Sequence, residues 1–324
     1  MTEAGHASVS TSRTWMLPVR WIMSLALLAY LGFTMDWQPL REAWVSFRPG
    51  LYAFGITAMA GYVVLSAWVL YRLLRARGLA IPLGAMVHVS LVGSFFGIFL
   101  PGGAGGDLVM GLRLCRDGQD RAGVVAAILF ARIAGLVAMV MVTLLVALCV
   151  DTPFRGIVPV CAMMLAGFAL LAALNREGVV AVVRSALPDR WRDARAVGAV
   201  ERLCDALRQF SRLRSLPGPL IGLLGMALAR GGMDYLMARS VGVELPLAWF
   251  MVFSTAVSII TLLPVSVAGI GLREASYAGL FSLAGADQSL GVAVSLLSFS
   301  LSLWVAGVGG MLFAVRGWSS HASR

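Results

Sequence analysis

The chain has 324 residues, of which 59% are hydrophobic and 13% are charged. A soluble globular domain carries about 25% charged residues, so this composition excludes an ordinary soluble protein and predicts a polytopic membrane protein. The net charge is +10, and all 26 basic residues are arginine. In a membrane protein, basic residues orient the helices and bind anionic lipid headgroups, so the charge does not indicate nucleic-acid binding.

Six apolar runs are long enough to cross the ~30 Å hydrocarbon core of a bilayer, which takes about 20 helical residues. They cover residues 17–35, 51–71, 122–150, 156–174, 219–240 and 289–315. The first run is too long for the apolar core of a signal peptide, and no small-residue cleavage pattern follows it. We therefore expect it to be retained as the first transmembrane helix.

Two further regions, residues 81–121 and 244–288, each contain an apolar run, a Gly/Pro break and a weaker apolar return. The break residues are Pro101, Gly105 and Gly106 in the first region, and Pro264, Gly269 and Gly271 in the second. Non-helical backbone at membrane depth persists only inside protein or beside a wet cavity, because unpaired backbone groups are costly in hydrocarbon. Two such breaks in corresponding positions of two halves are typical of a transporter with a binding site near the bilayer midplane.

The placement of arginine predicts how these two regions fold. If both are re-entrant hairpins, the arginines at 72–77, at 113–121 and in the nine-arginine stretch 176–214 all face the cytoplasm. If each region instead crosses the membrane once, the last two groups lie outside, against the positive-inside bias. We therefore predict an all-α membrane protein with six full transmembrane helices and two opposed re-entrant helical hairpins. This arrangement corresponds to an inverted repeat, with both termini in the cytoplasm.

The predicted organisation is one integral membrane domain, residues 15–316, between short cytoplasmic tails at 1–14 and 317–324. The cytoplasmic loop at 175–216 contains an apolar stripe with arginines outside it. This pattern is typical of an amphipathic helix lying on the inner leaflet. A cytoplasmic helix packed on the bundle would give the same pattern.

Ionisable side chains within the predicted spans and hairpins are candidate functional residues, since each costs at least about 2.5–3.5 kcal/mol to insert at the bilayer centre. The candidates are Asp107, Arg113, Arg132, Arg230, Asp234, Arg273, Glu274 and His88. No group of His, Cys and Asp has the spacing of a metal site, and no nucleotide-binding motif is present, so neither a metal nor a cofactor is expected.

Arg132 lies about ten residues into its helix, far from either membrane surface. Because a guanidinium matches phosphate oxygens bidentately, we expect Arg132 to bind a lipid phosphate. The alternative is a permanent ion pair with Asp107 or Glu274 that fixes a hairpin. Arg273 begins a helix, where the helix dipole disfavours a cation, so we expect it to meet an anion.

The other candidates each have two interpretations. Asp107 and Glu274 either balance charge and receive protons, or simply cap the helices that follow the glycines. Arg230 and Asp234 are four residues apart on one helix face, and form either a local ion pair or part of a cavity wall. His88 lies in an apolar helix and is either a hydrogen-bonded packing residue or a ligand.

The order and spacing of these motifs resemble a known family. The residues that carry the resemblance are the run 94–101 ending in Pro101, then Gly105-Gly106-Asp107, Arg113, Ala131-Arg132, Pro264 and Gly269-Ile270-Gly271-Leu272-Arg273-Glu274. Over residues 15–316 the chain resembles the transmembrane domain of lysylphosphatidylglycerol synthases and their free-standing, flippase-like relatives. The resemblance implies movement of a phospholipid between leaflets. The synthases transfer the amino acid with a separate cytoplasmic domain, which we expect this chain to lack.

We therefore expect a bacterial inner-membrane protein, not an enzyme, that binds an anionic phospholipid headgroup or another lipid-linked substrate and moves it across the bilayer. Arg132 and Arg273 are expected to meet the phosphate at the midplane, between the two glycine breaks. Arg113, Arg230, Asp234 and His88 are secondary candidates for the cavity. The expected partners are membrane lipids and, in addition, an enzyme of envelope synthesis. The alternatives are a membrane-embedded transferase and a scaffold for envelope lipid or glycolipid synthesis.

Overall fold

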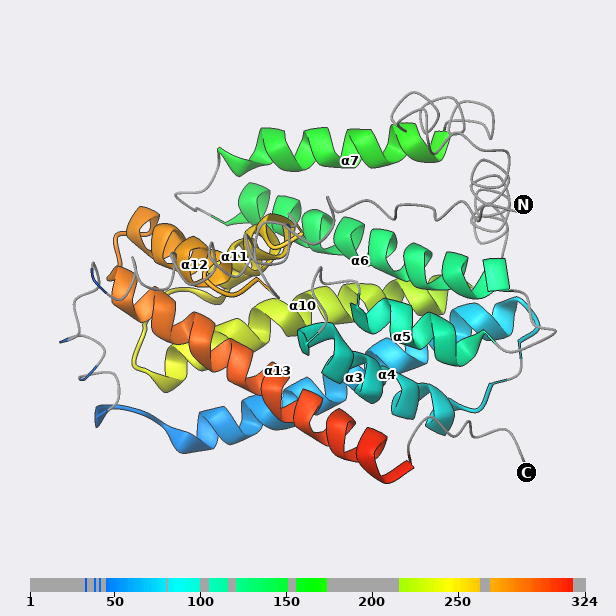
Figure 1. Cartoon of the computed structure of the whole chain (residues 1–324). Coiled ribbons are helices and arrows are strands. Elements are labelled where there is room, and N and C mark those ends of the chain that lie inside the picture. The colour runs from blue at the N-terminus through cyan, green and yellow to red at the C-terminus, as the bar shows by residue number, and fades with distance from the viewer. Residues whose placement is uncertain are drawn as a thin grey trace, which may run out of the picture.

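The computed structural model describes residues 33, 38, 41, 45–79, 81–99, 105–115, 121–150, 156–173, 216–262 and 269–316. The elements in these ranges are all α-helices: α3 (Pro49–Ala76), α4 (Leu83–Phe99), α5 (Gly105–Leu114), α6 (Arg121–Cys149), α7 (Ile157–Ala173), α10 (Pro217–Ser240), α11 (Leu247–Ile260), α12 (Leu272–Leu283) and α13 (Gln288–Arg316) (Figure 1). The predicted all-α class is confirmed for this part of the chain. The two tails, nearly all of the predicted first span and of the loop 175–216, Pro101 and Pro264 lie outside it.

Four of the described helices are long and apolar enough to cross a membrane. These are α3, α6, α10 and α13, with 28, 29, 24 and 29 residues. At 1.5 Å per residue the shortest of them measures about 36 Å, more than the ~30 Å hydrocarbon core. The predicted span at residues 156–174 corresponds to α7, which has 17 residues and lies at the short limit for a crossing helix.

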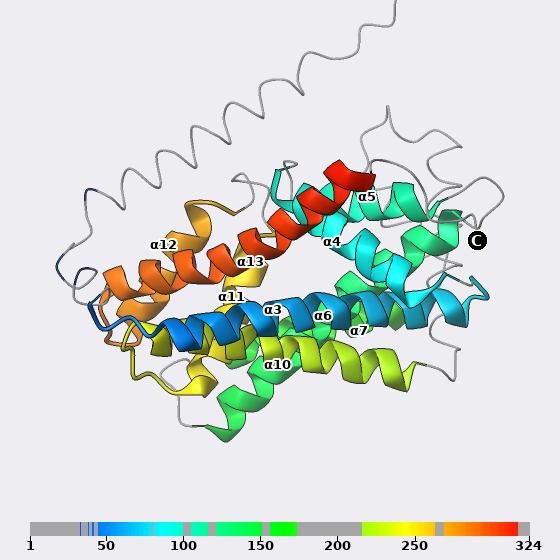
Figure 2. The same ribbon diagram turned by 90° about the horizontal axis from the view of Figure 1, so that it is seen from below.

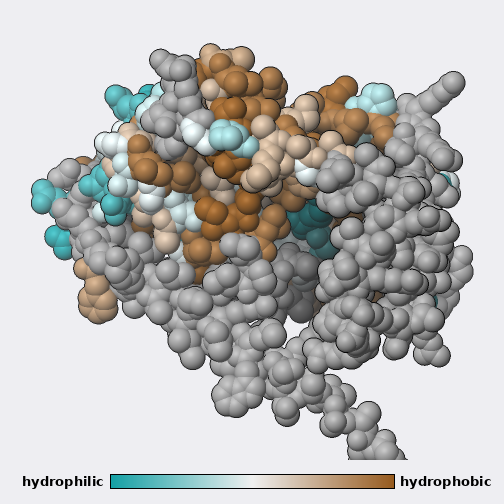
Figure 3. Space-filling model, turned by 90° about the horizontal axis from the view of Figure 1, so that it is seen from above, coloured by the Kyte–Doolittle hydropathy of each residue, from teal (hydrophilic) through white to brown (hydrophobic). Residues whose placement is uncertain are grey.

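The outer surface of these helices is apolar. Leu145, Leu148 and Met311 have 58%, 62% and 71% of their surface exposed, and much of the visible described surface in Figure 3 is hydrophobic. Hydrophilic residues gather there at one edge and in one hollow. An exposed apolar patch of this extent indicates a surface that faces lipid.

The two predicted break regions form two pairs of short helices. One pair is α4 and α5, and the other is α11 and α12, and the members of each pair pack against one another. The pairs lie at opposite ends of the long helices in both ribbon views (Figures 1 and 2). In the chain, each pair lies between the end of one long helix and the start of the next.

The described helices form two halves with the same order. In each half a long helix is followed by two short ones and a second long one, with 28, 17, 10 and 29 residues in α3–α6 and 24, 14, 12 and 29 in α10–α13. The first long helices are antiparallel, since the backbone N–H of Arg48, which precedes α3, donates to the carbonyl of Ser240 at the end of α10 over 2.8 Å. In the described ranges the two halves thus have the same order of helices, and their first long helices run in opposite directions.

Each half also extends its hairpin onto the other half. Helix α4 packs on α13, and α11 packs on α6. In the second of these contacts, the hydroxyls of Thr143 and Thr255 are 2.7 Å apart. The buried apolar side chains accordingly form two main clusters, one centred on α3–α6 and one centred on α10–α13.

Gly106, Gly269 and Gly271 in the two breaks occupy positions that a side chain would disturb. A Cβ on Gly106 would lie 2.5 Å from the carbonyl oxygen of Gly93, so only glycine allows α4 and α5 to approach this closely. Gly269 and Gly271 have φ angles of +78° and +82°, a region that residues with a Cβ rarely adopt.

Candidate functional site

Arg132 and Asp107 form a bidentate ion pair between α6 and α5. The Nε of Arg132 donates to Oδ2 of Asp107 over 2.7 Å, and Nη2 donates to Oδ1 over 2.8 Å. Arg132 is eleven residues beyond Arg121, the first residue of α6, which corresponds to about 16 Å along the helix axis. The pair therefore lies well inside the span. The sequence left two possible acidic partners for Arg132, Asp107 and Glu274, and the partner in the structure is Asp107.

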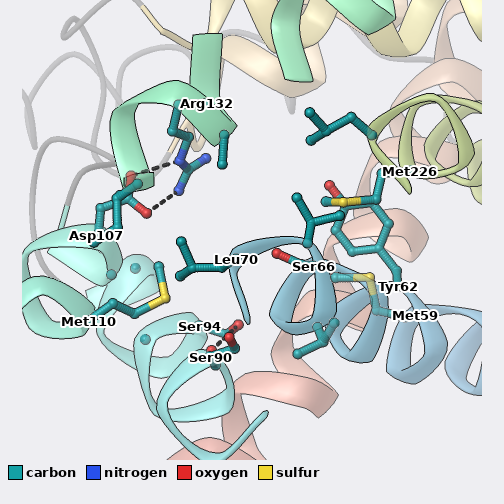
Figure 4. A pocket seen from close by; sticks show the side chains of 18 residues that line it. Met59, Tyr62, Ser66, Leu70, Ser90, Ser94, Asp107, Met110, Arg132 and Met226 are labelled. Atoms are coloured by element: carbon teal, nitrogen blue, oxygen red, sulfur yellow. Dashed lines mark hydrogen bonds and ion pairs between the residues drawn. The ribbon is translucent and has the colours of Figure 1, made fainter. Parts of the chain in front are cut away.

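A cavity of about 240 Å³ lies beside this ion pair. Its walls come from α3, α4, α5, α6 and α10, and are formed by Met59, Tyr62, Val63, Ser66, Val69, Leu70, Ser90, Gly93, Ser94, Gly97, Gly106, Asp107, Met110, Ile128, Ala131, Arg132, Leu223 and Met226. Figure 4 shows Arg132 and Asp107 on one side of it, and Tyr62 and Met226 on the other. The cavity is smaller than the ~300–1,000 Å³ of typical pockets for drug-sized ligands, so it has room for a small polar group rather than a whole lipid.

The cavity lining combines one ion pair with neutral groups. Its charged residues are Arg132 and Asp107, so the described lining has no net charge. The hydroxyl of Ser94 donates to the carbonyl of Ser90 over 2.9 Å. Because Asp107 occupies Nε and Nη2, Nη1 of Arg132 is the guanidinium nitrogen that neither of these hydrogen bonds uses. In Figure 4 this nitrogen points away from Asp107.

The ion pair can be reached from the outside of the bundle. The side chain of Arg132 is 60% exposed, whereas that of Asp107 is 19% exposed. The exposed large side chains next to it on the two helices are apolar: Leu108 and Leu112 on α5, and Leu129 and Ile133 on α6. The charged side chain of Arg132 is thus exposed on a surface that is otherwise suited to contact with hydrocarbon.

Arg273 and Glu274 form a second, buried ion pair at the start of α12. Nη2 of Arg273 donates to Oε1 of Glu274 over 3.0 Å, and Nε donates to the hydroxyl of Ser295 on α13 over 3.1 Å. The guanidinium carbon also lies 4.3 Å from the centre of the Phe299 ring. Oε2 of Glu274 accepts a hydrogen bond of 2.6 Å from the N–H of Gly271, so this carboxylate caps the helix, as one of its two interpretations expected.

A third cluster joins α10 to α12. Arg230 and Asp234 form the local pair predicted from their spacing, with 3.9 Å between Nε and Oδ2. Asp234 is buried, and the hydroxyl of Tyr277 donates to its Oδ2. This hydrogen bond stabilises a carboxylate that would otherwise be costly at membrane depth.

The cavity and the third cluster are neighbours. Tyr62, in the cavity wall, lies near both Arg132 and Arg230. Tyr277 of the third cluster lies near Arg273 in the same way. The charged residues therefore form a series of neighbouring groups through the described part of the bundle, but Arg273 is not among the residues that line the cavity beside Arg132.

The remaining sequence candidates lie outside the cavity lining. His88 is half-buried on α4. The guanidinium of Arg113 lies over the ring of Phe313 on α13, 5.4 Å from its centre. Gly105, the first residue of α5, is buried. Within the described ranges no group of His, Cys, Asp or Glu could hold a metal ion.

The sequence interpretation did not include several polar residues of these sites. Ser90 and Ser94 are four residues apart and share a helix face, a spacing that could have indicated a polar stripe on α4. Tyr277 follows Glu274 by three residues and could have been placed beside it in the same way. Tyr62 and Ser66 are likewise four residues apart on α3, so the same spacing could have indicated them.

The described part of the chain is all-helical and has the long apolar helices of an integral membrane protein, with ion pairs between and beside them. A family model, the transmembrane region of lysylphosphatidylglycerol synthase, matches residues 21–310. The chain therefore belongs to this family, as the motif resemblance predicted, and is a membrane protein of lipid-related processes. No curated protein and no solved structure gave a match.

Proposed function

We propose that this protein binds the phosphate-bearing headgroup of a membrane lipid at the Arg132–Asp107 cavity and moves the lipid between the leaflets of a bacterial inner membrane. The observation that carries the proposal is the position of Arg132. Its guanidinium is ionised at membrane depth and lies beside a cavity, and the side chain as a whole is 60% exposed. An ionisable group in such a place is a functional-site hypothesis by default, because insertion costs at least about 2.5–3.5 kcal/mol.

The size and opening of the site favour a lipid over a free solute. A cavity of about 240 Å³ accommodates a headgroup fragment, and the acyl chains would remain outside it. The apolar side chains around the opening, such as Leu108 and Leu129, suit the acyl chains. The headgroup would meet Nη1 of Arg132 first and compete with Asp107 for the other two guanidinium nitrogens, since guanidinium binds phosphate in the same bidentate geometry.

The proposal includes the membrane topology. Six full crossings, with the α4–α5 and α11–α12 pairs as re-entrant hairpins from opposite faces and both termini in the cytoplasm, place Arg132 within the bilayer. The proposal is transport without a reaction at the site, and an enzyme of envelope synthesis is the proposed source or acceptor of the lipid. In this topology the α4–α5 hairpin lines the cavity, as interrupted helices line the binding sites of secondary transporters.

The test measures lipid movement in vesicles that contain the purified protein. A fluorescent phosphatidylglycerol in one leaflet becomes accessible to an impermeant quencher when it crosses. We expect Arg132→Gln to reduce the protein-dependent rate at least about tenfold. Arg132→Lys should also reduce the rate, because a lysine keeps the charge but loses the bidentate geometry. Arg75→Gln is the control, since Arg75 is exposed, donates to Tyr71 four residues earlier on the same helix, and should retain the rate. Equal rates in the Arg132 and Arg75 variants would reject the proposal.

A charge exchange separates lipid binding from a purely structural ion pair. In the Asp107→Arg/Arg132→Asp double variant, the pair can form with its partners reversed. If the pair only fixes the hairpin, the double variant should restore lipid movement. If Arg132 meets the phosphate, the exchange should restore expression and thermal stability but leave lipid movement at the level of Arg132→Gln.

A further inference from the structure

The two halves can be compared residue by residue, because their equivalent helices share a register. Ser90 is the eighth residue of α4, counted from Leu83, and Ser254 is the eighth of α11, counted from Leu247. The twelfth residues are serines too, and both donate to the serine carbonyl four residues earlier: Ser94 to Ser90 over 2.9 Å, and Ser258 to Ser254 over 2.6 Å. The same helix face therefore carries the same hydrogen bonds in both hairpins.

The register relates the two ion pairs. Asp107 and Glu274 are each the third residue of their helices, α5 and α12. Arg132 is the twelfth residue of α6, and the twelfth residue of α13 is Phe299. Each half thus has an acidic residue on its hairpin, but the second half has an aromatic ring where the first half has its arginine.

The missing guanidinium of the second half comes from the hairpin itself. Arg273 is the second residue of α12, and the second residue of α5 is Gly106. The Arg273 guanidinium pairs with Glu274 and lies 4.3 Å from the Phe299 ring. It therefore occupies the space between hairpin carboxylate and long helix that Arg132 occupies in the first half.

The two pairs differ in exposure. The side chains of Arg132 and Asp107 are 60% and 19% exposed, whereas those of Arg273 and Glu274 are 9% and 2% exposed. The buried pair has additional hydrogen bonds to Ser295 and to the N–H of Gly271, which a buried ion pair requires to offset desolvation. The first half has glycine at the position of Arg273, and an open cavity lies beside its ion pair.

We propose that the second half contains a counterpart of the Arg132–Asp107 site that the chain's own Arg273 fills, so that a single headgroup binds per chain. The identity of the ligand as a lipid phosphate rests on the proposed function. Arg273 is then a positioning residue, which holds Glu274 and the second hairpin in place. The first hairpin alone meets the substrate.

Reversing the two differences should open the second site. The double variant Arg273→Gly/Phe299→Arg gives the second half the residues of the first. The reporter is Ser295→Cys, in a chain whose four native cysteines are replaced by serine, treated with a small charged thiol reagent. We expect no reaction of this cysteine beside the native Arg273 and Phe299, and a reaction at least about tenfold faster in the double variant. Ser94→Cys, in the open cavity, should react equally in both backgrounds, which shows that the first half is intact.

This thiol measurement involves no lipid, so it tests whether Arg273 closes the second site independently of the proposed function. Fast reaction of Ser295→Cys beside the native Arg273, or slow reaction in the double variant with an intact first half, would overturn the proposal. Binding is then counted by native mass spectrometry with phosphatidylglycerol. One Arg132-dependent lipid is expected per chain, none in Arg132→Gln, and one again when the double variant is added to Arg132→Gln.

The two measurements together separate the possible failures. If the native chain binds no lipid through Arg132, the proposed function fails, whereas the thiol result still shows whether Arg273 closes a second site. If the native chain binds one lipid, but the opened second site binds none, the counterpart is not a headgroup site and the inference is wrong. A second lipid bound by the native chain independently of Arg132 would overturn it as well.

Discussion

Individual charged residues in this protein differ in how their charge is balanced. Glu274 pairs with its sequence neighbour Arg273 and accepts a hydrogen bond from the N–H of Gly271. Its negative charge is therefore balanced within the second hairpin. Asp107 depends on Arg132, which is 25 residues away and largely exposed. The Arg132–Asp107 pair can exchange one partner for a ligand, because fewer neighbouring groups hold its side chains in place.

Tyr277 provides a prediction for the buried cluster. Tyr277→Phe removes the hydroxyl that donates to buried Asp234, and an unsatisfied buried group costs about 1–3 kcal/mol. We expect a clearly lower thermal midpoint for the purified protein at a fixed scan rate. Tyr71→Phe is the control, since it removes an exposed hydrogen bond from Arg75 and surface changes are usually within about 0.5 kcal/mol. Equal midpoints would show that the Tyr277–Asp234 bond does not stabilise the protein.

At the scale of elements, the two hairpins have the same order of short helices but pack them with different residues. In the first, Gly93 and Gly106 let the backbones of α4 and α5 meet directly. In the second, the equivalent positions in the shared register are Val257 and Arg273, whose side chains prevent the same approach. The glycines therefore close the first hairpin on itself and leave its cavity side open.

Gly106→Ala tests this close approach. The added methyl would lie 2.5 Å from the Gly93 carbonyl oxygen, and overpacking of this kind costs about 1–3 kcal/mol. We expect lower stability and a reduced rate of lipid movement in vesicles. Gly279→Ala is the matched control in α12, because no heavy atom lies within 4 Å of its Cβ position and the change favours the helix. An active, stable Gly106→Ala protein would contradict the steric role.

At the scale of the whole molecule, the antiparallel halves explain how one chain presents a hairpin at each end of the bundle. Helices α3 and α10 pack together as the central antiparallel pair. Each half then adds a hairpin that contacts the last long helix of the other half. If the long helices span the membrane, the two hairpins enter it from opposite faces.

Cysteine labelling tests this orientation. In a chain without native cysteines, Arg121→Cys marks the start of α6, and Glu244→Cys marks the segment between α10 and α11, where the side chain is 84% exposed. Re-entrant hairpins place residue 121 in the cytoplasm and residue 244 outside, whereas single crossings of the two regions reverse both. An impermeant reagent should label only Glu244→Cys in intact spheroplasts, and both sites after permeabilisation. The opposite labelling pattern would reject the two-hairpin topology.

The sequence by itself determined the features that depend on near neighbours. Apolar runs of sufficient length predicted the helices α3, α6, α10 and α13, because a membrane-spanning helix must satisfy its backbone internally. The glycine breaks predicted the interruptions in both hairpins. The Arg230–Asp234 pair was predictable as well, since residues four apart share a helix face.

Tertiary structure alone decided which distant residues meet. The sequence left Arg132 with two acidic candidates, and the packing of α5 on α6 pairs it with Asp107. Arg273 was expected to share a ligand with Arg132, but Phe299 and Ser295 of α13 enclose it in a separate site. Such partners come from different helices, and their distances depend on how whole faces pack, which local periodicity does not encode. For that reason the sequence located the charges, and the fold decided that one ion pair is open and the other closed.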